Sequence, residues 1–82
     1  MTIAELPSNQ LDRHRRDAGL SHGELWLRYF ELGGMSTALQ VEAYLYGALQ
    51  PSLHDHNMLV HALNERFVEL GSTRRIPYIE AW

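Results

Sequence analysis

Hydrophobic residues recur at helical spacing along most of the chain, and four breaks divide the pattern. The breaks lie at Gly19, Gly33-Gly34, Gln50-Pro51 and Gly71. Glycine ends helices readily because it adopts left-handed backbone without strain, and proline disfavours helical geometry in the residue before it. The pattern therefore predicts four helical segments followed by a C-terminal tail.

The second segment carries the clearest helical signal. Ser21 and Glu24 have the spacing of a capping box, in which each side chain bonds the backbone N–H of the other residue. One narrow stripe of charged residues interrupts the apolar run that follows. A helix that is apolar over most of its girth is usually buried on several sides. We therefore expect this segment to be the central helix, with Trp26 and Phe30 as its main core residues.

The other three segments differ in the apolar surface they offer. The first, from about Ser8 to Ala18, is mostly polar and is expected at the periphery. The third begins at a Thr37–Gln40 capping box and is expected to run to Pro51, and the fourth begins with the same pattern at Ser52–Asp55. The expected core faces are Ala38, Val41, Leu45, Ala48 and Leu49 in the third segment, and Leu59, Val60, Leu63, Phe67 and Leu70 in the fourth.

These segments predict an all-α fold, with a compact four-helix domain over residues 1–71 and an extended C-terminal tail over 72–82. The length of 82 residues gives room for one domain with a thin core. The chain has no cysteine, so neither a disulfide nor a thiolate metal site can support that core. A small domain of this kind often gains further burial by dimerising or by docking on a partner.

Charge and hydropathy narrow the classes of partner. The formal net charge is −3, and all seven basic residues are arginine. This balance argues against a nucleic-acid binder that acts through bulk charge. No run approaches the ~20 apolar residues that span a bilayer, and the first ten residues lack the features of a signal peptide. We expect no membrane contact and a cytoplasmic location.

Few side chains in this sequence are arranged for chemistry. His54, His56 and His61 lie close in sequence, but helical metal ligands need spacings of three or four residues, which these do not have. No nucleophile elbow and no glycine-rich phosphate loop is present. The residues between Gly33 and Thr37 precede a helix start, where an anion can bind, but they also fit a tight interhelical turn. We expect no enzyme activity, no catalytic residue, no metal and no cofactor.

Aromatic residues outside the expected core favour a protein partner. Tyr44 and Tyr46 flank the apolar face of the third segment, and Tyr78 and Trp82 lie in the tail. Tyrosine and tryptophan are the residue types that most often anchor interfaces. The sequence therefore predicts a non-catalytic protein–protein interaction or regulatory module that uses these four residues. Its partner is either another protein or a second copy of the chain, which would make it a homodimer.

DNA binding is the alternative function. Residues 11–21 resemble the opening of a repressor-type helix-turn-helix, with an arginine-rich first helix and a Gly-Leu-Ser entry to the second. That resemblance implies that Arg13, Arg15 and Arg16 contact phosphates. The chain departs from the motif afterwards, because its second helix is longer and more apolar. The third segment, where a recognition helix would lie, has no arginine or lysine.

A second resemblance covers more of the chain. The stretch from Leu20 to Gly34 and the run Ala62-Leu63-Asn64-Glu65-Arg66 resemble small helical proteins of actinobacteria, and the likeness spans roughly residues 19–78. The absence of lysine agrees with such a source. The resemblance implies no activity, because none is assigned to that group.

Overall fold

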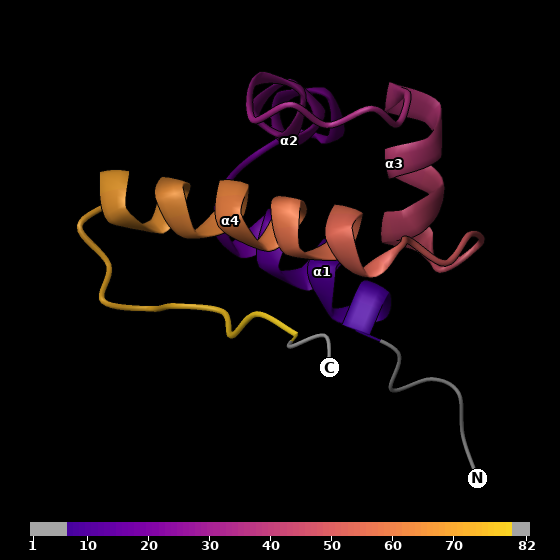
Figure 1. The fold of residues 1–82 in the computed structure, drawn as a ribbon. Coiled ribbons are helices and arrows are strands. Elements are labelled where there is room, and N and C mark those ends of the chain that lie inside the picture. Colours follow the sequence, from indigo (N-terminus) through magenta and orange to yellow (C-terminus); the bar gives the residue numbers. More distant parts are fainter. Residues whose placement is uncertain (1–6, 80–82) are drawn as a thin grey trace, which may run out of the picture.

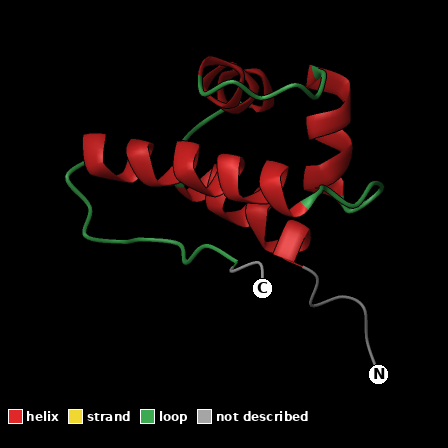
Figure 2. Ribbon diagram, viewed as in Figure 1, coloured by secondary structure: helices red, strands yellow, loops and turns green. Residues whose placement is uncertain are grey.

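The computed structural model describes residues 7–79 of the chain, with side chains from residue 10 onward. Within that range the chain forms four α-helices and no β-strand (Figures 1 and 2). The predicted all-α, four-helix fold with a C-terminal tail is confirmed. None of these four helices combines the length and hydropathy that crossing a bilayer requires. The helices are α1 (Pro7–Asp17), α2 (His22–Glu31), α3 (Ala38–Tyr46) and α4 (Leu53–Glu69).

Side-chain caps start three of these helices. At α2, the Glu24 N–H donates to Ser21 Oγ (3.1 Å), and the Ser21 N–H donates to Glu24 Oε1 (2.8 Å). The predicted capping box at Thr37 and Gln40 is present at α3 as well. At α4, Ser52 caps the Asp55 N–H (3.0 Å). The reciprocal half of that third box is missing, because the Asp55 carboxylate bonds other groups.

The third helix is shorter than its sequence pattern suggested. It ends at Tyr46, and Gly47 follows with φ +78°, in the left-handed region that favours glycine. The break therefore comes before Pro51. The prediction that Ala48 and Leu49 belong to the helical core face is wrong, since both are exposed and lie beyond the helix.

The first helix is part of the core, so the prediction that it is peripheral is wrong. Leu11 is fully buried, and so is Ala18 in the turn that follows α1. The helix packs against both α3 and α4, and so does α2. The signal was missed because α1 is polar everywhere except along one short stripe.

The core gathers around α4, which crosses the whole molecule in Figure 1. Tyr29 is the largest side chain that is fully buried. Phe30 was expected beside it but is 54% exposed, so its assignment to the core is wrong. Ala38 and Leu70 are exposed as well. The core residues are Leu11, Ala18, Leu20, Leu25, Tyr29, Val41, Tyr44, Leu45, Leu59, Val60, Ala62, Leu63, Phe67 and Ile76.

Candidate interaction surface

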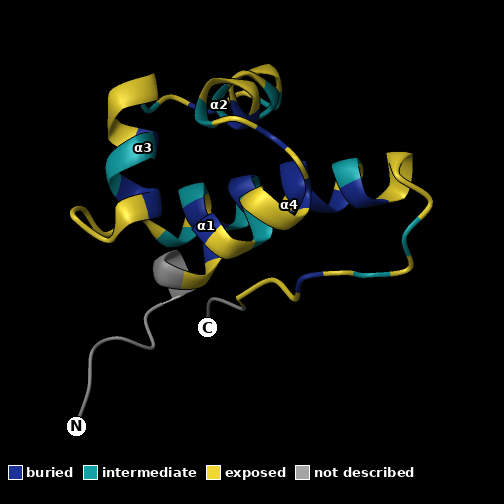
Figure 3. Cartoon of the chain, turned by 180° about the vertical axis from the view of Figure 1, so that it is seen from behind, coloured by how far each residue is buried: buried dark blue, intermediate teal, exposed yellow. Residues whose placement is uncertain are grey.

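One face of α2 presents apolar side chains to solvent. Gly23, Trp26, Leu27 and Phe30 follow the spacing i, i+3, i+4, i+7, which places them together on the helix surface. We call these four residues the outer stripe. Leu27 and Phe30 are exposed, and Trp26 is half-buried. Figure 3 shows exposed positions on the side of α2 that faces away from α4. The helix therefore has two apolar faces, and the chain itself covers one of them.

Contacts within the chain hold the outer stripe in place. The ring of Trp26 stacks on that of Phe30, with centroids 5.2 Å apart. The Trp26 indole N–H donates to the carbonyl oxygen of Ser36 (3.1 Å), in the turn between α2 and α3. Met35, the residue before Ser36, is 92% exposed and extends the apolar surface onto that turn. A surface whose aromatic side chains are already fixed loses little conformational entropy when it binds.

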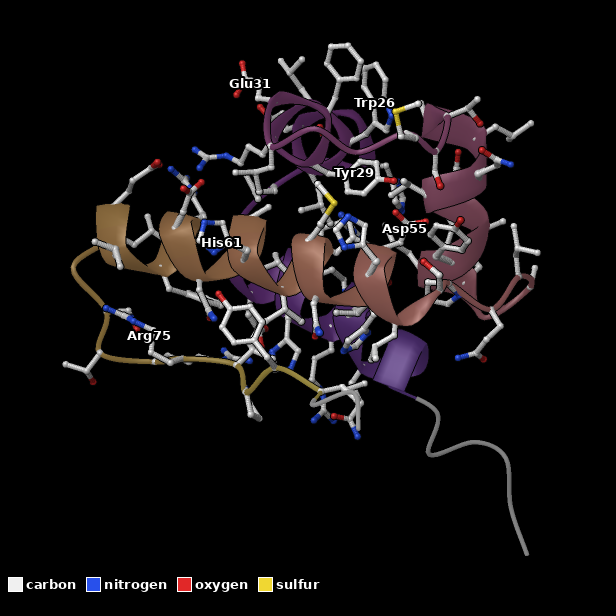
Figure 4. The ribbon with its side chains drawn as sticks, viewed as in Figure 1. Trp26, Tyr29, Glu31, Asp55, His61 and Arg75 are labelled. Carbon is white, nitrogen blue, oxygen red and sulfur yellow. The ribbon has the colours of Figure 1, made fainter. Side chains whose placement is uncertain are left out.

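A partly buried polar network holds the same turn on the side that faces the core. The carboxylate of Asp55 accepts hydrogen bonds from the hydroxyls of Tyr29 (2.7 Å) and Ser36 (3.0 Å). Tyr44 adds a longer bond of 3.3 Å. Burial raises the pKa of the Tyr29 hydroxyl, so the group stays protonated and donates. In Figure 4, Tyr29 and Asp55 point toward each other, whereas Trp26 projects from the other side of α2. We call Tyr29, Ser36, Tyr44 and Asp55 the Asp55 network.

The glycine pair of the turn has a packing role. Gly34 is buried, and a Cβ atom at this position would collide with the ring of Tyr29. The Gly34 N–H donates to the Tyr29 carbonyl (3.1 Å). Gly33 has φ +99°, where a side chain is strained. These two residues therefore form the tight interhelical turn that the sequence allowed, and they bring Ser36 within reach of both Trp26 and Tyr29.

Paired charges border the outer stripe on one side. The guanidinium of Arg28 forms two hydrogen bonds with the carboxylate of Glu69, at 2.7 and 2.9 Å. This contact raises the pKa of Arg28 and lowers that of Glu69. A groove of about 450 Å³ lies here between α2 and α4. Its charged lining residues are Glu24, Arg28, Glu31, Glu65, Arg66 and Glu69.

Three of the four predicted partner-binding aromatic residues lie within the described part of the chain, and their surroundings differ. Tyr44 is buried, and its hydroxyl belongs to the Asp55 network, so we assign this residue to the interior. Tyr46 is exposed and packs edge-on against the ring of His22 (5.3 Å between centroids). Tyr78 lies on the tail, where its hydroxyl bonds His61 Nδ1 (2.9 Å). Trp82 lies outside the described residues.

The predicted phosphate-contacting arginines are largely engaged within the chain. Arg15 donates to the Asp12 carboxylate (2.8 Å) and to the Leu20 carbonyl (2.8 Å). Arg16 also pairs with Asp12. Arg13 is exposed. Asp12 therefore offsets part of the positive charge that this cluster carries in the sequence.

The three histidines of α4 point to different surroundings. His56 is buried, whereas His54 and His61 are exposed. Among residues 7–79, no three histidine or acidic side chains gather closely enough to hold a metal ion.

Two histidines, the half-buried His14 and the buried His56, give a testable pH dependence. Burial lowers the pKa of His14, helped by the nearby Arg74 cation, and burial alone lowers that of His56. The folded chain therefore binds fewer protons than the unfolded chain once the pH falls below the ordinary value of 6.5. We expect the urea midpoint to fall between pH about 7.5 and about 5.5, above the range where carboxylates titrate. His56→Gln should flatten this slope, and a midpoint constant over the range would contradict the account.

Sequence reasoning missed the outward position of the outer stripe. The helical periodicity predicted that every apolar residue of α2 is buried. It did not distinguish burial by the rest of this chain from burial by a partner. A usable signal was present, because counting i, i+3, i+4, i+7 from Gly23 gives a second apolar stripe next to that of Leu25 and Tyr29. A scan against protein-family models and searches of curated proteins and of solved structures gave no match to this chain.

Proposed function

We propose that this chain is a non-catalytic protein–protein interaction module that pairs with a second copy of itself through the outer stripe of α2. The observation that carries the proposal is the solvent exposure of Leu27, Phe30 and Met35, in a chain whose core is complete without them. Large apolar side chains gathered on one face typically mark an interaction site. The thin core of a short chain favours the same conclusion.

The shape of the outer stripe favours a second copy over other partners. Gly23 lies at one end of the stripe, with open space above its Cα, and the Phe30 ring stands at the other end. An antiparallel second α2 places each Phe30 over the Gly23 of the partner copy. Such an interface is two-fold symmetric, which is the commonest arrangement in homodimers. Antiparallel helices also bring opposite ends of their dipoles together.

The size of the stripe predicts a reversible dimer. It lies on a helix of ten residues. Standard stable interfaces bury about 800 Å² on each partner, which is more than one face of so short a helix provides. We therefore expect the dimer to form and dissociate with concentration.

Cysteine cross-linking tests this pairing directly, because the chain has no cysteine of its own. Position 27 lies near the expected two-fold axis, so a Leu27→Cys chain should form a disulfide with a second copy on mild oxidation. Val68→Cys is the matched control, since Val68 is equally apolar and is exposed on α4. We expect cross-linked dimer from Leu27→Cys and little from Val68→Cys. Equal yields, or no dimer from either chain, would remove the proposal.

DNA binding stays the second candidate, favoured by one observation. Helices α2 and α3 are joined by a turn, and in Figure 1 α2 is seen end-on while α3 stands upright beside it, so their axes make a steep angle, as those of a helix-turn-helix do. The charge distribution disfavours DNA binding, because α3 carries no basic residue and Asp12 pairs with Arg15 and Arg16.

A gel-shift experiment separates the two candidates. We expect no retarded complex with duplex DNA at about 50 mM salt. DNA binding would replace the dimer proposal if a complex formed, weakened by about tenfold or more on raising the salt to about 200 mM, and disappeared in an Arg13→Ala/Arg16→Ala chain. A complex that the double substitution left intact would point to contacts other than this arginine cluster.

A further inference from the structure

One side of α4 holds the C-terminal tail by its main chain. Residues 72–79, which we call the docked tail, run back along α4 in the direction opposite to the helix (Figure 1). Asn64 Nδ2 donates to the Ile76 carbonyl (3.0 Å), and Asn64 Oδ1 accepts from the Ile76 N–H (2.8 Å). Asn57 makes the same pair of bonds with Ile79, at 2.8 and 2.9 Å. Each asparagine amide thus takes the place of a peptide group on a neighbouring strand.

The spacing of the two asparagines matches an extended chain. Asn57 and Asn64 are seven residues apart, which is two helical turns and a rise of about 10.5 Å on the same face. Ile76 and Ile79 are three residues apart, and extended backbone covers about 10 Å over that distance. The two asparagine amides on the helix are therefore spaced to match the backbone groups of Ile76 and Ile79 in an extended chain. These four bonds depend on the backbone of the tail and not on its side chains.

Side-chain contacts add a limited sequence requirement. Ile76 is 8% exposed and belongs to the hydrophobic core, and together with Leu11 and His56 it lines a hollow of about 230 Å³. Towards α1, the Arg74 guanidinium pairs with Asp17 (3.0 Å) and lies over the Phe67 ring. An aliphatic side chain at the position of Ile76 is thus the main apolar requirement for binding to this side of α4.

The docked tail is held by modest interactions. Ile76 is its single contribution to the hydrophobic core, and the Asn57 pair with Ile79 is exposed to solvent. Segments with few buried contacts and exposed hydrogen bonds open locally at a free energy well below that of global unfolding. A hollow of about 430 Å³, lined in part by His61, Val68 and Tyr78, also remains beside the tail. The tail therefore occupies the groove without filling it.

We propose that this side of α4 is a binding groove for an extended peptide segment of a partner protein, and that the docked tail is its intramolecular competitor. The partner segment carries an aliphatic residue at the position of Ile76 and offers its backbone to Asn57 and Asn64. This is strand-like recognition of main chain, performed by a helix instead of a sheet edge. The partner must displace the tail, so the tail limits access to the groove. The groove is separate from the outer stripe, and the proposal does not depend on dimerisation.

A labelled synthetic peptide with the sequence of residues 72–79 tests the proposal in the full chain. The unaltered chain should bind it weakly, because its own tail is present at high effective concentration. A full-length Ile76→Asp chain should bind the peptide about tenfold or more tightly than the unaltered chain does. Two changes should abolish that gain: Asn64→Ala added to the Ile76→Asp chain, and N-methylation of the peptide at its isoleucine corresponding to Ile76, which removes the N–H that Asn64 Oδ1 accepts.

Three results would overturn the proposal. The first is an Ile76→Asp chain that keeps its helical circular dichroism and does not bind the peptide. The second is equal binding of the N-methylated peptide, which would mean that the backbone is not recognised. The third applies to the unaltered chain and covers the case in which Ile76→Asp does not fold. We expect the Ile76 amide to exchange with deuterium through local opening, and exchange only by global unfolding would mean that the tail does not leave its groove while the chain is folded.

Discussion

Replacing Asp55 with alanine is expected to lower the free energy of unfolding by about 3 kcal/mol. The Asp55 carboxylate accepts from Tyr29 and Ser36 at 2.7 and 3.0 Å, and from Tyr44 at 3.3 Å. Hydrogen bonds to a charged group contribute about 1.5–3 kcal/mol, and removing Asp55 takes away the acceptor of the buried Tyr29 hydroxyl. The expected loss is below the sum of the three bonds, because the hydroxyls retain bonds to one another and the site can relax.

Urea denaturation of matched variants measures this effect. His54→Ala is the control, because His54 is the exposed neighbour of Asp55 on the same helical turn and should change stability by less than about 0.5 kcal/mol. Asp55→Asn keeps one acceptor oxygen and should lose less than Asp55→Ala. If Asp55→Ala were as stable as His54→Ala, the Asp55 network would contribute nothing to stability. Asp55→Ala should also weaken self-association, because Ser36 links the Asp55 network to Trp26 in the outer stripe.

Replacing Phe30 with glutamate is expected to weaken self-association by about 100-fold or more, which corresponds to about 2.8 kcal/mol. The reason is the cost of burying an unpaired carboxylate in an apolar contact, and two-fold symmetry applies that cost twice. The stability of the single chain should change little, because Phe30 is about half exposed there and lies outside the hydrophobic core. Val68→Glu is the matched control, an exposed apolar residue of α4 that lies outside the outer stripe, and it should leave association unchanged.

Gly23→Ala tests the expected register of the pair. No atom lies within 4 Å of an added Cβ at this position, and the backbone there is helical. Alanine in a helix is more favourable than glycine by about 0.5–1 kcal/mol, so the single chain should become more stable. In the dimer, the added methyl group should meet Phe30 of the second copy and weaken association. If Gly23→Ala raised both the stability of the single chain and the strength of self-association, Gly23 would not face Phe30 of the second copy.

Local signals in the sequence predicted the helices well. The capping boxes at Ser21 and Thr37 involve residues three positions apart, and both are present in the structure. The end of α3 was misplaced because Pro51 was given more weight than Gly47, although a left-handed glycine ends a helix as effectively as a following proline. Helix boundaries that neighbouring residues determine could therefore be predicted from the sequence. The end of α3 was misplaced because the sequence offers two valid stop signals, Gly47 and Pro51.

The polar contacts between helices could not be predicted from the sequence, because the residues that form them are far apart along the chain. Asp55 has the position of a capping-box acid, but its partners Ser36 and Tyr29 lie 19 and 26 residues away. Asn57 and Asn64 likewise give no local sign of the tail that they hold, 22 and 12 residues further on. Tyr44 was predicted to bind a partner for the same reason, since the hydrogen-bond partners of its hydroxyl, Ser36 and Asp55, belong to other segments of the chain.

We propose that a second copy of the chain covers the outer stripe of α2. Light scattering of the full-length chain over a concentration series tests it most directly, with the Phe30→Glu chain measured alongside. We predict a mass that rises from one chain to two as concentration increases, and a Phe30→Glu chain that stays at the mass of one. A mass of one chain at every concentration, or a dimer that persists in Phe30→Glu, would contradict the account.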